Sequence, residues 1–342
     1  MLNLGIIGAG AVVQGAHVAV IKAAGDVEVV AVADPVEPNR RAIGDALGCS
    51  KTSEDYRSVL DDPKVQAVDI CLPHFMHERV VLDAFEAGKD VLLEKPIALT
   101  LDEADRMIAA AATHGRQFYV SLNQRFYPAH RRLKEILNSG EYGKPFLALA
   151  QLIGDEFARM NVREGWKGTW DRAGGGALAD TGTHIIDLML WWFGRPKTVS
   201  CHYGRFMVEP DNKGDDNVCV TLGYDGMLAD VVVSYSAISD AWTEYKQVYF
   251  PKDSIHITMA PEHPMLHGAN KQPHQPVPVE APANWWTSSV GASVAHFLEC
   301  LAGKAEPWFG PEAARDTLEI ILLAYKAANE GRTLGVPARN AK

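Results

Sequence analysis

The amino-terminal segment of the chain runs from an apolar strand into a glycine turn and then into a helix. Leu2–Ile7 is almost wholly apolar, and Gly8-Ala9-Gly10 follows it directly, before a helix-like stretch over residues 15–24. The first glycine permits a tight turn, the second lets the backbone approach a pyrophosphate, and the helix amino terminus attracts phosphate. The third small residue of the usual fingerprint is absent, because Val13 stands in its place. We therefore predict a dinucleotide site whose cofactor contacts come from the turn: Gly8, Gly10, Ala11, Val12 and Val13.

The second predicted strand, Val27–Ala33, ends in Asp34. A carboxylate at this interval after the glycines can accept hydrogen bonds from the ribose hydroxyls of NAD, and it would repel the 2′-phosphate of NADP. NAD is therefore the predicted cofactor and NADP is less favoured. The pair Arg40-Arg41 argues against this preference for NAD, because these side chains could fold back to hold a phosphate. We interpret both arginines instead as solvated charges of a helix face.

Strands and helices alternate with short connections as far as residue 121. Further apolar strands are predicted over residues 67–71, 91–93 and 117–120, with helices over 76–87 and 100–113 between them. Such an alternation is typical of a doubly wound parallel sheet. The sequence therefore predicts an α/β Rossmann dinucleotide-binding domain over residues 1–121.

The pattern changes in the second half of the chain. Alternating strands separated by turn clusters are predicted there, over residues 146–153, 198–206, 218–224, 227–236, 245–250 and 255–259. Asp225-Gly226 is a hairpin signal, and residues 261–282, rich in proline and polar residues, are predicted to form an extended loop. We therefore predict that residues 122–342 form an α+β domain with a large, mostly antiparallel, open-faced sheet.

Overall charge and cysteine usage restrict the class of partner. The 342-residue chain carries a formal net charge of -10, whereas nucleic acids and anionic membranes usually require a basic surface. No basic leader precedes the first strand, and no apolar run approaches the roughly 20 residues that span a bilayer. The five cysteines are widely separated and lack C-x-x-C spacing. We therefore expect a cytoplasmic protein with no nucleic-acid or membrane partner.

A lysine follows the fourth predicted strand in an unusual setting. The stretch Asp90-Val91-Leu92-Leu93-Glu94-Lys95-Pro96 carries Lys95 to the carboxyl end of the strand, where open α/β sheets bind ligands. Pro96 restricts its own φ and disfavours helical geometry at Lys95, so the ammonium is expected on a stiff, extended backbone. A surface lysine at a strand end is the simpler alternative.

Glu94-Lys95-Pro96 resembles the Glu-Lys-Pro motif of the glucose-fructose oxidoreductase and inositol dehydrogenase family (Gfo/Idh/MocA). The resemblance covers nearly the whole chain and includes Pro73 and His77 after the strand at 67–71, although His74 stands where asparagine is common. It implies that the loop Leu72, Pro73, His74 and His77 lies along NAD, together with Glu94 and Lys95.

Further along the chain, the stretch that begins at Asn123 and Arg125 resembles the family's turn between domains. Asn123 is a candidate for substrate binding and Arg125 for cofactor binding, and the alternative is that Arg125 only fixes the turn. In the family, the open-faced sheet commonly forms the oligomer interface, which implies a homodimer or homotetramer.

The most specific match is the run Gly174-Gly175-Gly176 with Asp180, His184 and Asp187 downstream. If the helix has begun by Asp180, these residues recur at i, i+4 and i+7 along one face. The glycines would let the backbone approach a ligand. A metal site is the other interpretation of this spacing, but the cofactor signals make it unnecessary, so no metal is predicted.

The resemblance implies an NAD-dependent dehydrogenase acting on a secondary hydroxyl of a sugar, sugar acid or polyol. His184 would be the base, Lys95 would polarise the hydroxyl, and Asp180 would orient His184 or bind an adjacent hydroxyl. Residues 155–172 are the expected specificity lid, whose candidate side chains are Arg159, Arg163, Trp166, Trp170 and Asp171. Arg163 and Trp170 are singled out for a carboxylate and a sugar face, respectively.

Two other functions remain open from the sequence. The first is an enzyme that recycles bound NAD during net isomerisation, elimination or glycoside hydrolysis, for example an oxidoisomerase acting on a sugar acid such as apionate. The second is a non-catalytic NAD-binding regulator. Lys95, Asp180 and His184 argue against the regulator, because a pure binding protein has no need for a base beside the nicotinamide.

Overall fold

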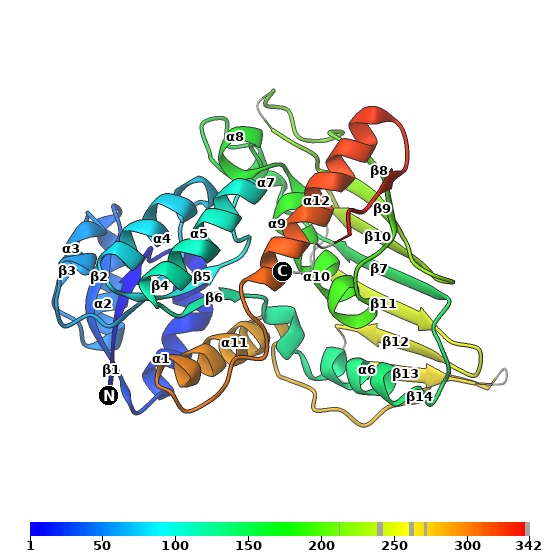
Figure 1. Cartoon of the computed structure of the whole chain (residues 1–342), viewed down its shortest axis with the longest axis horizontal. Coiled ribbons are helices and arrows are strands. Elements are labelled where there is room, and N and C mark those ends of the chain that lie inside the picture. The colour runs from blue at the N-terminus through cyan, green and yellow to red at the C-terminus, as the bar shows by residue number, and fades with distance from the viewer. Residues whose placement is uncertain (212, 238–241, 260–262, 270–271, 339–342) are drawn as a thin grey trace. The chain divides into compact units, whose positions relative to one another are not determined.

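The structure is a computed structural model, which describes residues 1–211, 213–237, 242–259, 263–269 and 272–338 (Figure 1). The chain divides into two compact units. The first unit consists of Met1–Asn123 and Trp286–Arg315, and the second of Gln124–Trp285 and Asp316–Lys342. No helix of the described residues has both the length and the apolar character needed to cross a membrane.

In the first unit, the described residues form a six-stranded parallel sheet in the order β3-β2-β1-β4-β5-β6. Its strands are β1 (Leu2–Ile7), β2 (Val27–Ala33), β3 (Thr52–Ser53), β4 (Ala67–Ile70), β5 (Asp90–Glu94) and β6 (Phe118–Ser121). This order is that of the Rossmann fold, and the predicted fold class is confirmed. The order reverses direction between β1 and β4, and the carboxyl ends of these two strands are where such sheets bind ligands.

Short helices connect these strands. They are η1 (Val13–His17), α1 (Val18–Ala23), α2 (Glu37–Leu47), α3 (Arg57–Leu60), η2 (His74–Met76), α4 (His77–Glu86) and α5 (Leu101–His114). Thr100 begins α5 with a complete capping box, in which Glu103 N–H donates to the Thr100 hydroxyl while the Glu103 carboxylate accepts from the Thr100 N–H. This reciprocal capping satisfies amides that have no partner within the helix and fixes where α5 starts.

Helix α11 (Trp285–Leu301) belongs almost wholly to the first unit, although it lies far along the chain. Its apolar side chains Val294 and Phe297 are fully buried in the same core as Leu4 and Ile6 of β1, and Figure 1 shows α11, in orange, beside α1. The predicted division at residues 121 and 122 assigned this helix to the second domain. A single boundary in the sequence cannot assign a later helix to the first domain, because the apolar face of a helix does not indicate which hydrophobic core it will join.

In the second unit, the described residues form a nine-stranded sheet in the order β14-β13-β12-β11-β7-β10-β9-β8-β15. Its strands are β7 (Leu147–Ile153), β8 (Thr198–Gly204), β9 (Asn217–Gly223), β10 (Leu228–Ser234), β11 (Thr243–Tyr249), β12 (Ser254–Thr258), β13 (Met265–Gly268), β14 (Gln275–Pro276) and β15 (Leu334–Gly335). The pairings are antiparallel except that of β7 with β10. The predicted, mostly antiparallel sheet is therefore confirmed.

One segment of this sheet was not predicted. Residues 261–282 were expected to be an extended loop, but β13 and β14 lie within that range and pair with each other and with β12. The four residues Met265–Gly268 are too short a run among prolines to give a periodic signal. Residues 261, 262, 270 and 271 lie outside the described part of the chain.

The described part of the second unit also contains helices, several of which share a core with the sheet. They are η3 (Asn123–Phe126), α6 (Pro128–Ser139), α7 (Phe157–Met160), α8 (Trp170–Ala173), α9 (Ala177–Asp180), α10 (Gly182–Phe193) and α12 (Glu312–Glu330). In β7 and β9, buried residues alternate with half-buried or exposed ones. The buried set, such as Ala148, Ala150 and Val220, shares a core with Ile185 and Leu188 of α10.

Candidate active site

The turn after β1 is shaped for a close approach of backbone to ligand. Gly8 has φ +93°, and a Cβ there would lie 2.1 Å from the Cys71 carbonyl oxygen, so a side chain is excluded by both conformation and space. At Gly10, in contrast, a Cβ would meet nothing within 4 Å. The space beside Gly10 is therefore open at the start of the first helix, whose amide dipoles favour a pyrophosphate. These features fit the dinucleotide predicted at Gly8, Gly10, Ala11, Val12 and Val13.

Asp34 is fixed at the carboxyl end of β2 by two backbone amides. Its Oδ2 accepts from the Ala9 N–H at 2.7 Å and its Oδ1 from the Val36 N–H at 2.8 Å. The carboxylate therefore supports the glycine turn and keeps further lone pairs for ribose hydroxyls. Arg41 is an exposed helix charge paired with Glu37, as expected.

Arg40 departs from its interpretation as a solvated charge. Its Nη1 lies 3.1 Å from the carbonyl oxygen of Asp34 and 3.2 Å from that of Pro35, so the guanidinium folds back against the end of β2. Two carbonyl acceptors in one turn hold it there, and this tertiary arrangement is not visible in the sequence. The negative charge of Asp34 still disfavours a 2′-phosphate at this position.

Lys95 is half-buried and follows β5 directly. The peptide bond between Lys95 and Pro96 is cis. The backbone N–H of Lys95 donates to Oε2 of the preceding Glu94 at 3.2 Å. The lysine therefore stands where the sequence predicted it, at the ligand-binding edge of the sheet, on a backbone that its two neighbours constrain.

The loop after β4 is tied to the segment around Lys95 through a fully buried histidine. His77 Nε2 lies 2.9 Å from the Leu72 carbonyl oxygen and its Nδ1 lies 2.9 Å from that of Pro96. Burial lowers the pKa of His77, while these two carbonyl contacts act in the opposite direction. The neighbouring His74 is buried, and its ring centroid is 5.7 Å from that of His77. His77 thus joins the loops that follow β4 and β5, whereas its predicted contact with the cofactor stays a prediction.

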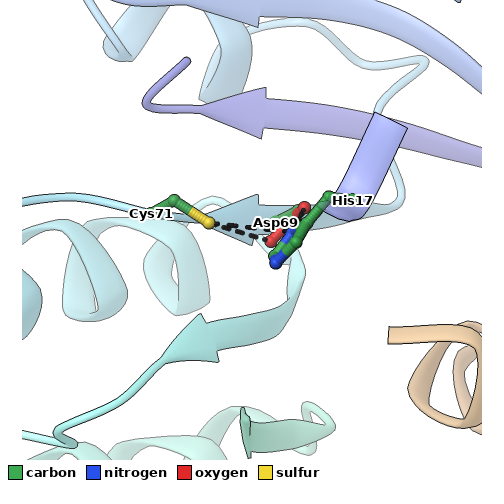
Figure 2. A group of neighbouring side chains, drawn as sticks. All are labelled: His17, Asp69 and Cys71. Carbon is green, nitrogen blue, oxygen red and sulfur yellow. Dashed lines mark hydrogen bonds and ion pairs between the residues drawn. The ribbon is translucent and has the colours of Figure 1, made fainter. Parts of the chain in front are cut away.

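A further buried histidine, which the sequence-based reasoning missed, lies close to Glu94. His17 Nδ1 is 2.7 Å from Asp69 Oδ2, its Nε2 is 3.5 Å from Glu94 Oε1, and both His17 and Asp69 are fully buried. Figure 2 shows His17 beside Asp69 of β4 and Cys71, which directly follows that strand; the Cys71 sulfur is 3.6 Å from Asp69 Oδ1. The available signal was Asp69 itself, because a carboxylate inside an apolar strand requires a partner.

In the second unit, Asp180 lies in a network of polar side chains. Asp180 Oδ2 accepts from the Tyr235 hydroxyl at 2.7 Å and pairs with Lys167 Nζ at 2.7 Å. Lys167 Nζ is also 3.4 Å from Glu156. Burial and the Asp180 charge raise the pKa of Tyr235 well above its ordinary value, so Tyr235 remains a donor. Tyr235 and Lys167 were not predicted, because they lie 55 residues after and 13 residues before Asp180 and only the fold unites them.

The helix that carries His184 is interrupted where it was expected to be continuous. Asp180 ends α9, and α10 begins at Gly182 after Thr181, with the His184 N–H donating to the Thr181 carbonyl oxygen at 3.1 Å. His184 is half-buried on α10. Asp180 pairs with Tyr235 and Lys167, whereas Asp187 pairs with Arg125.

Asp187 forms a buried ion pair with Arg125. Asp187 Oδ2 accepts from Arg125 Nε at 2.9 Å and Oδ1 from Nη2 at 2.6 Å, and Thr317 Oγ1 donates to Oδ1 at 3.3 Å. This bidentate geometry supports the alternative that Arg125 has a structural function. Its predicted contact with the cofactor stays untested.

The glycine run before α9 serves internal packing. A Cβ at Gly175 would lie 2.3 Å from the Tyr325 hydroxyl, and one at Gly176 would lie 1.7 Å from the Asp215 carbonyl oxygen. The buried Asp215 carboxylate accepts from the N–H groups of Gly176 and Leu178 at 3.0 and 2.9 Å, and so caps α9. At these two glycines, therefore, the atoms that approach the backbone closely belong to the protein and not to a ligand.

The expected substrate residues lie in different surroundings. Asn123 is buried, and its Nδ2 donates to Ser289 Oγ at 2.9 Å. Arg163 is exposed and lines a cavity of about 800 Å³ in the second unit, together with Asp171 and Arg172. Trp170 is 42% exposed and packs edge-on against Tyr325, with 5.0 Å between ring centroids. Arg159 is also exposed and pairs with Glu156 at 3.4 Å.

Within the described residues, the titratable groups close enough to share a metal ion are His17, Asp69 and Cys71. The short distance between His17 Nδ1 and Asp69 Oδ2 is that of a hydrogen bond. Burial raises the pKa of the Cys71 thiol, which disfavours the thiolate that a metal would need.

Comparison with known proteins assigns the chain to a family. Residues 2–122 match the model of an oxidoreductase family with an NAD-binding Rossmann fold, and residues 130–256 match the carboxyl-terminal domain of the same GFO/IDH/MocA family. Together the two matches cover more than half of the chain, including the whole first sheet and strands β7 to β11 of the second.

Two of the curated relatives that the chain resembles are named as dehydrogenases. The chain is 26% identical to D-apiose dehydrogenase from Paraburkholderia graminis over 333 residues, which are 92% of this chain and 84% of the relative. It is 30% identical to levoglucosan dehydrogenase from Pseudarthrobacter phenanthrenivorans over 212 residues, which are 58% of this chain and 54% of the relative. The second alignment thus spans about half of each protein.

A solved structure of levoglucosan dehydrogenase in complex with NADH superposes on the chain with a TM-score of 0.87. The sequence identity is 21%, and the superposition covers 98% of this chain and 99% of the other, so it supports the fold. The two family matches and the glycine turn lead to one conclusion: the chain belongs to the Gfo/Idh/MocA family of oxidoreductases and is an enzyme that uses NAD.

Proposed function

We propose that the protein oxidises a secondary hydroxyl of a sugar, sugar acid or polyol, with NAD as the hydride acceptor. The observation that carries this proposal is the position of Lys95 at the carboxyl end of β5, in a domain that matches an NAD-binding Rossmann fold. Names of relatives such as levoglucosan dehydrogenase and D-apiose dehydrogenase support a carbohydrate substrate.

The residues around the turn after β1 would hold the cofactor. The open space beside Gly10 fits a pyrophosphate, and the fixed carboxylate of Asp34 fits the ribose hydroxyls. When bound, NAD supplies an acceptor for the hydride that leaves the substrate carbon.

The protein's own task is to manage the hydroxyl proton and the charge that develops on oxygen. We assign the proton to His184, because a neutral imidazole accepts a proton near neutral pH. Lys95 donates a hydrogen bond to the same oxygen and stabilises its developing negative charge. Asp180 orients His184 or binds a neighbouring hydroxyl, and Tyr235 and Lys167 hold its carboxylate.

Substrate choice would depend on the segment of residues 155–172. Arg163 lines an open cavity and is the candidate for a substrate carboxylate, which makes a sugar acid an attractive member of any substrate panel. Trp170 retains an exposed part of its ring that could pack against a sugar.

The test is to incubate the purified protein with NAD and a panel of levoglucosan, D-apiose, glucosides, inositols and aldonates while following the absorbance of reduced nicotinamide. Oxidation of at least one member is expected. If every member remains unoxidised, the proposed net oxidation is wrong. NAD that copurifies and never accumulates in reduced form would point to redox-neutral chemistry instead.

Matched variants test the role of Lys95. Lys95→Met removes the ammonium but keeps much of the side-chain volume, and it is expected to lower kcat by about 100-fold or more while NAD still binds. Lys64→Met, at an exposed position away from the glycine turn, serves as the control and is expected to keep wild-type turnover. Equal activity of the two variants would contradict the assignment.

A further inference from the structure

The buried imidazole of His17 lies between two carboxylates that come from neighbouring strands. Asp69 lies on β4 and Glu94 ends β5, and these strands pair in parallel. His17 Nδ1 is 2.7 Å from Asp69 Oδ2, and Nε2 is 3.5 Å from Glu94 Oε1. His17 itself closes the π-helical turn η1, a rare local geometry that is frequent at functional sites.

This geometry calls for a charged imidazole. A neutral imidazole has one N–H and one lone pair, so it would aim a lone pair at one of the two carboxylates. An imidazolium donates from Nδ1 to Asp69 and places its positive charge at ion-pair distance, 3.5 Å, from Glu94 Oε1. Burial by itself lowers the pKa of His17, but the combined effect of Asp69 and Cys71 outweighs burial and leaves that pKa well above its ordinary value.

The Glu94 carboxylate connects this imidazolium to the residue proposed to act on substrate. Its Oε1 faces His17 while its Oε2 accepts from the backbone N–H of Lys95 at 3.2 Å. On the other side of Lys95, the Pro96 carbonyl oxygen lies 2.9 Å from His77 Nδ1. Each neighbour of Lys95 in the chain is thus tied to a buried histidine.

We propose that His17 is a positioning residue for Lys95: as an imidazolium between Asp69 and Glu94, it fixes the Glu94 carboxylate and, through it, the backbone that carries the catalytic ammonium. This inference rests on the proposed function of Lys95. His17, Asp69 and Glu94 would thus determine the position of the Lys95 ammonium without contacting the substrate themselves.

The charge state can be tested without turnover. In NAD-saturated protein with ¹⁵N-labelled histidine, the long-range ¹H–¹⁵N spectrum of His17 is expected to show both ring nitrogens protonated at pH about 8, above the ordinary histidine pKa of about 6.5. The signal is assigned by its loss in His17→Gln. Asp69→Asn is expected to convert it to a neutral imidazole. A neutral His17 in the wild-type protein, or a stoichiometric metal ion that is lost in His17→Gln, would overturn the proposal.

The positioning effect is tested by kinetics on a substrate oxidised in the panel. His17→Gln is expected to lower kcat by about 10- to 100-fold with little change in the KM for NAD, because a small displacement of a reacting group has effects of this size. His296→Gln is the matched control, since His296 is a largely buried histidine of the same unit whose Nε2 accepts from the Trp308 N–H. It is expected to keep wild-type kcat.

A double variant separates positioning from stability. His17→Gln with Asp69→Asn leaves no unpaired charge on Asp69, so its melting temperature should recover relative to His17→Gln alone, whereas kcat should stay low because Glu94 still lacks its partner. If kcat recovers together with stability, or if His17→Gln matches His296→Gln, the proposal is wrong. Retention of turnover by Lys95→Met, in contrast, would refute the proposed role of Lys95 itself.

Discussion

At the scale of single residues, the buried histidines differ in charge according to the atoms that face them. His17 faces carboxylates and its pKa is raised, whereas burial lowers the pKa of His77, which lies between two carbonyl oxygens. His130 is buried beside one carbonyl oxygen, and burial together with the Lys246 charge places its pKa well below the ordinary value. The sequence shows where the histidines are but not which groups face them in the fold. Asp69, for example, lies 52 positions from His17 in the chain.

The first prediction concerns how the stability contributed by His17 depends on pH. Because its pKa is raised in the folded protein, this contribution is complete below the ordinary pKa of about 6.5 and is lost as the pH rises through the raised value. His17→Gln should therefore lower the free energy of unfolding by about 3–5 kcal/mol at acidic-to-neutral pH, and by less at alkaline pH. Urea unfolding of both proteins across this range checks it. A difference that grows as the pH rises would contradict the assigned charge.

At the scale of elements, the strands of the first unit were the most predictable part of the fold. β1 and β2 have the predicted bounds, because each is a continuous apolar run between a turn and a polar residue. The start of α9 could not be predicted, since Asp215 caps it from a distant segment. Local signals therefore sufficed where an element is stabilised locally, and failed where a distant side chain decides where it begins.

The second prediction separates the two glycines of the turn after β1. Gly8→Ala should destabilise the protein by at least about 1–3 kcal/mol, the usual cost of a strained backbone conformation, because its Cβ would also meet the Cys71 carbonyl oxygen. Gly10→Ala should fold with near wild-type stability, since a Cβ there meets nothing within 4 Å. It should nevertheless weaken NAD binding by about tenfold or more, a change of about 1.4 kcal/mol. Thermal melts and NADH fluorescence titrations measure the two effects; unaltered NADH affinity of Gly10→Ala would contradict the placement of the pyrophosphate.

The third prediction concerns the ion pair that links η3 to α10. Arg125→Met leaves the buried Asp187 carboxylate without its bidentate partner, so the second unit should lose about 3–5 kcal/mol of stability. Arg132→Met removes an exposed arginine that pairs with Glu135, and its effect should be within about 0.5 kcal/mol. Urea unfolding monitored by tryptophan fluorescence compares them. Equal effects of the two variants would show that the buried pair contributes little.

At the scale of the whole molecule, the two sheets were predicted from the change of periodicity along the chain. The return of the chain to the first unit at Trp286–Arg315 was not predicted. Helix α11 completes the core of the first unit from residues beyond 285, and its Phe297 packs in that core. The candidate site shows the same limit. Lys95 and the glycine turn were found in the sequence because each is a local motif, whereas Lys167 and Tyr235 became recognisable only through their contacts with Asp180.

The fourth prediction is that the second sheet mediates a homodimer or homotetramer. Leu149 of β7 and Val232 of β10 are half-buried and alternate with core residues such as Ala150. Leu149→Lys with Val232→Lys should reduce the particle mass measured by light scattering while each unit stays folded, because charges are disfavoured at the centre of an interface. Ala112→Lys, at an exposed position on α5, is the control and should leave the mass unchanged. A monomeric wild-type protein would contradict this prediction.

We propose that Lys95 and His184 act on a single alcohol oxygen beside NAD. A double-mutant cycle in kcat/KM on a substrate oxidised in the panel tests it most directly, with Lys95→Met, His184→Asn and the double variant. Each single substitution should lower kcat/KM by about 10²–10⁴-fold, and the double substitution should lower it by less than the product of the two, since the groups act together. His114→Asn, an exposed histidine on α5, should have no effect. Near wild-type kcat/KM in either single variant, or strictly multiplicative losses, would contradict the account.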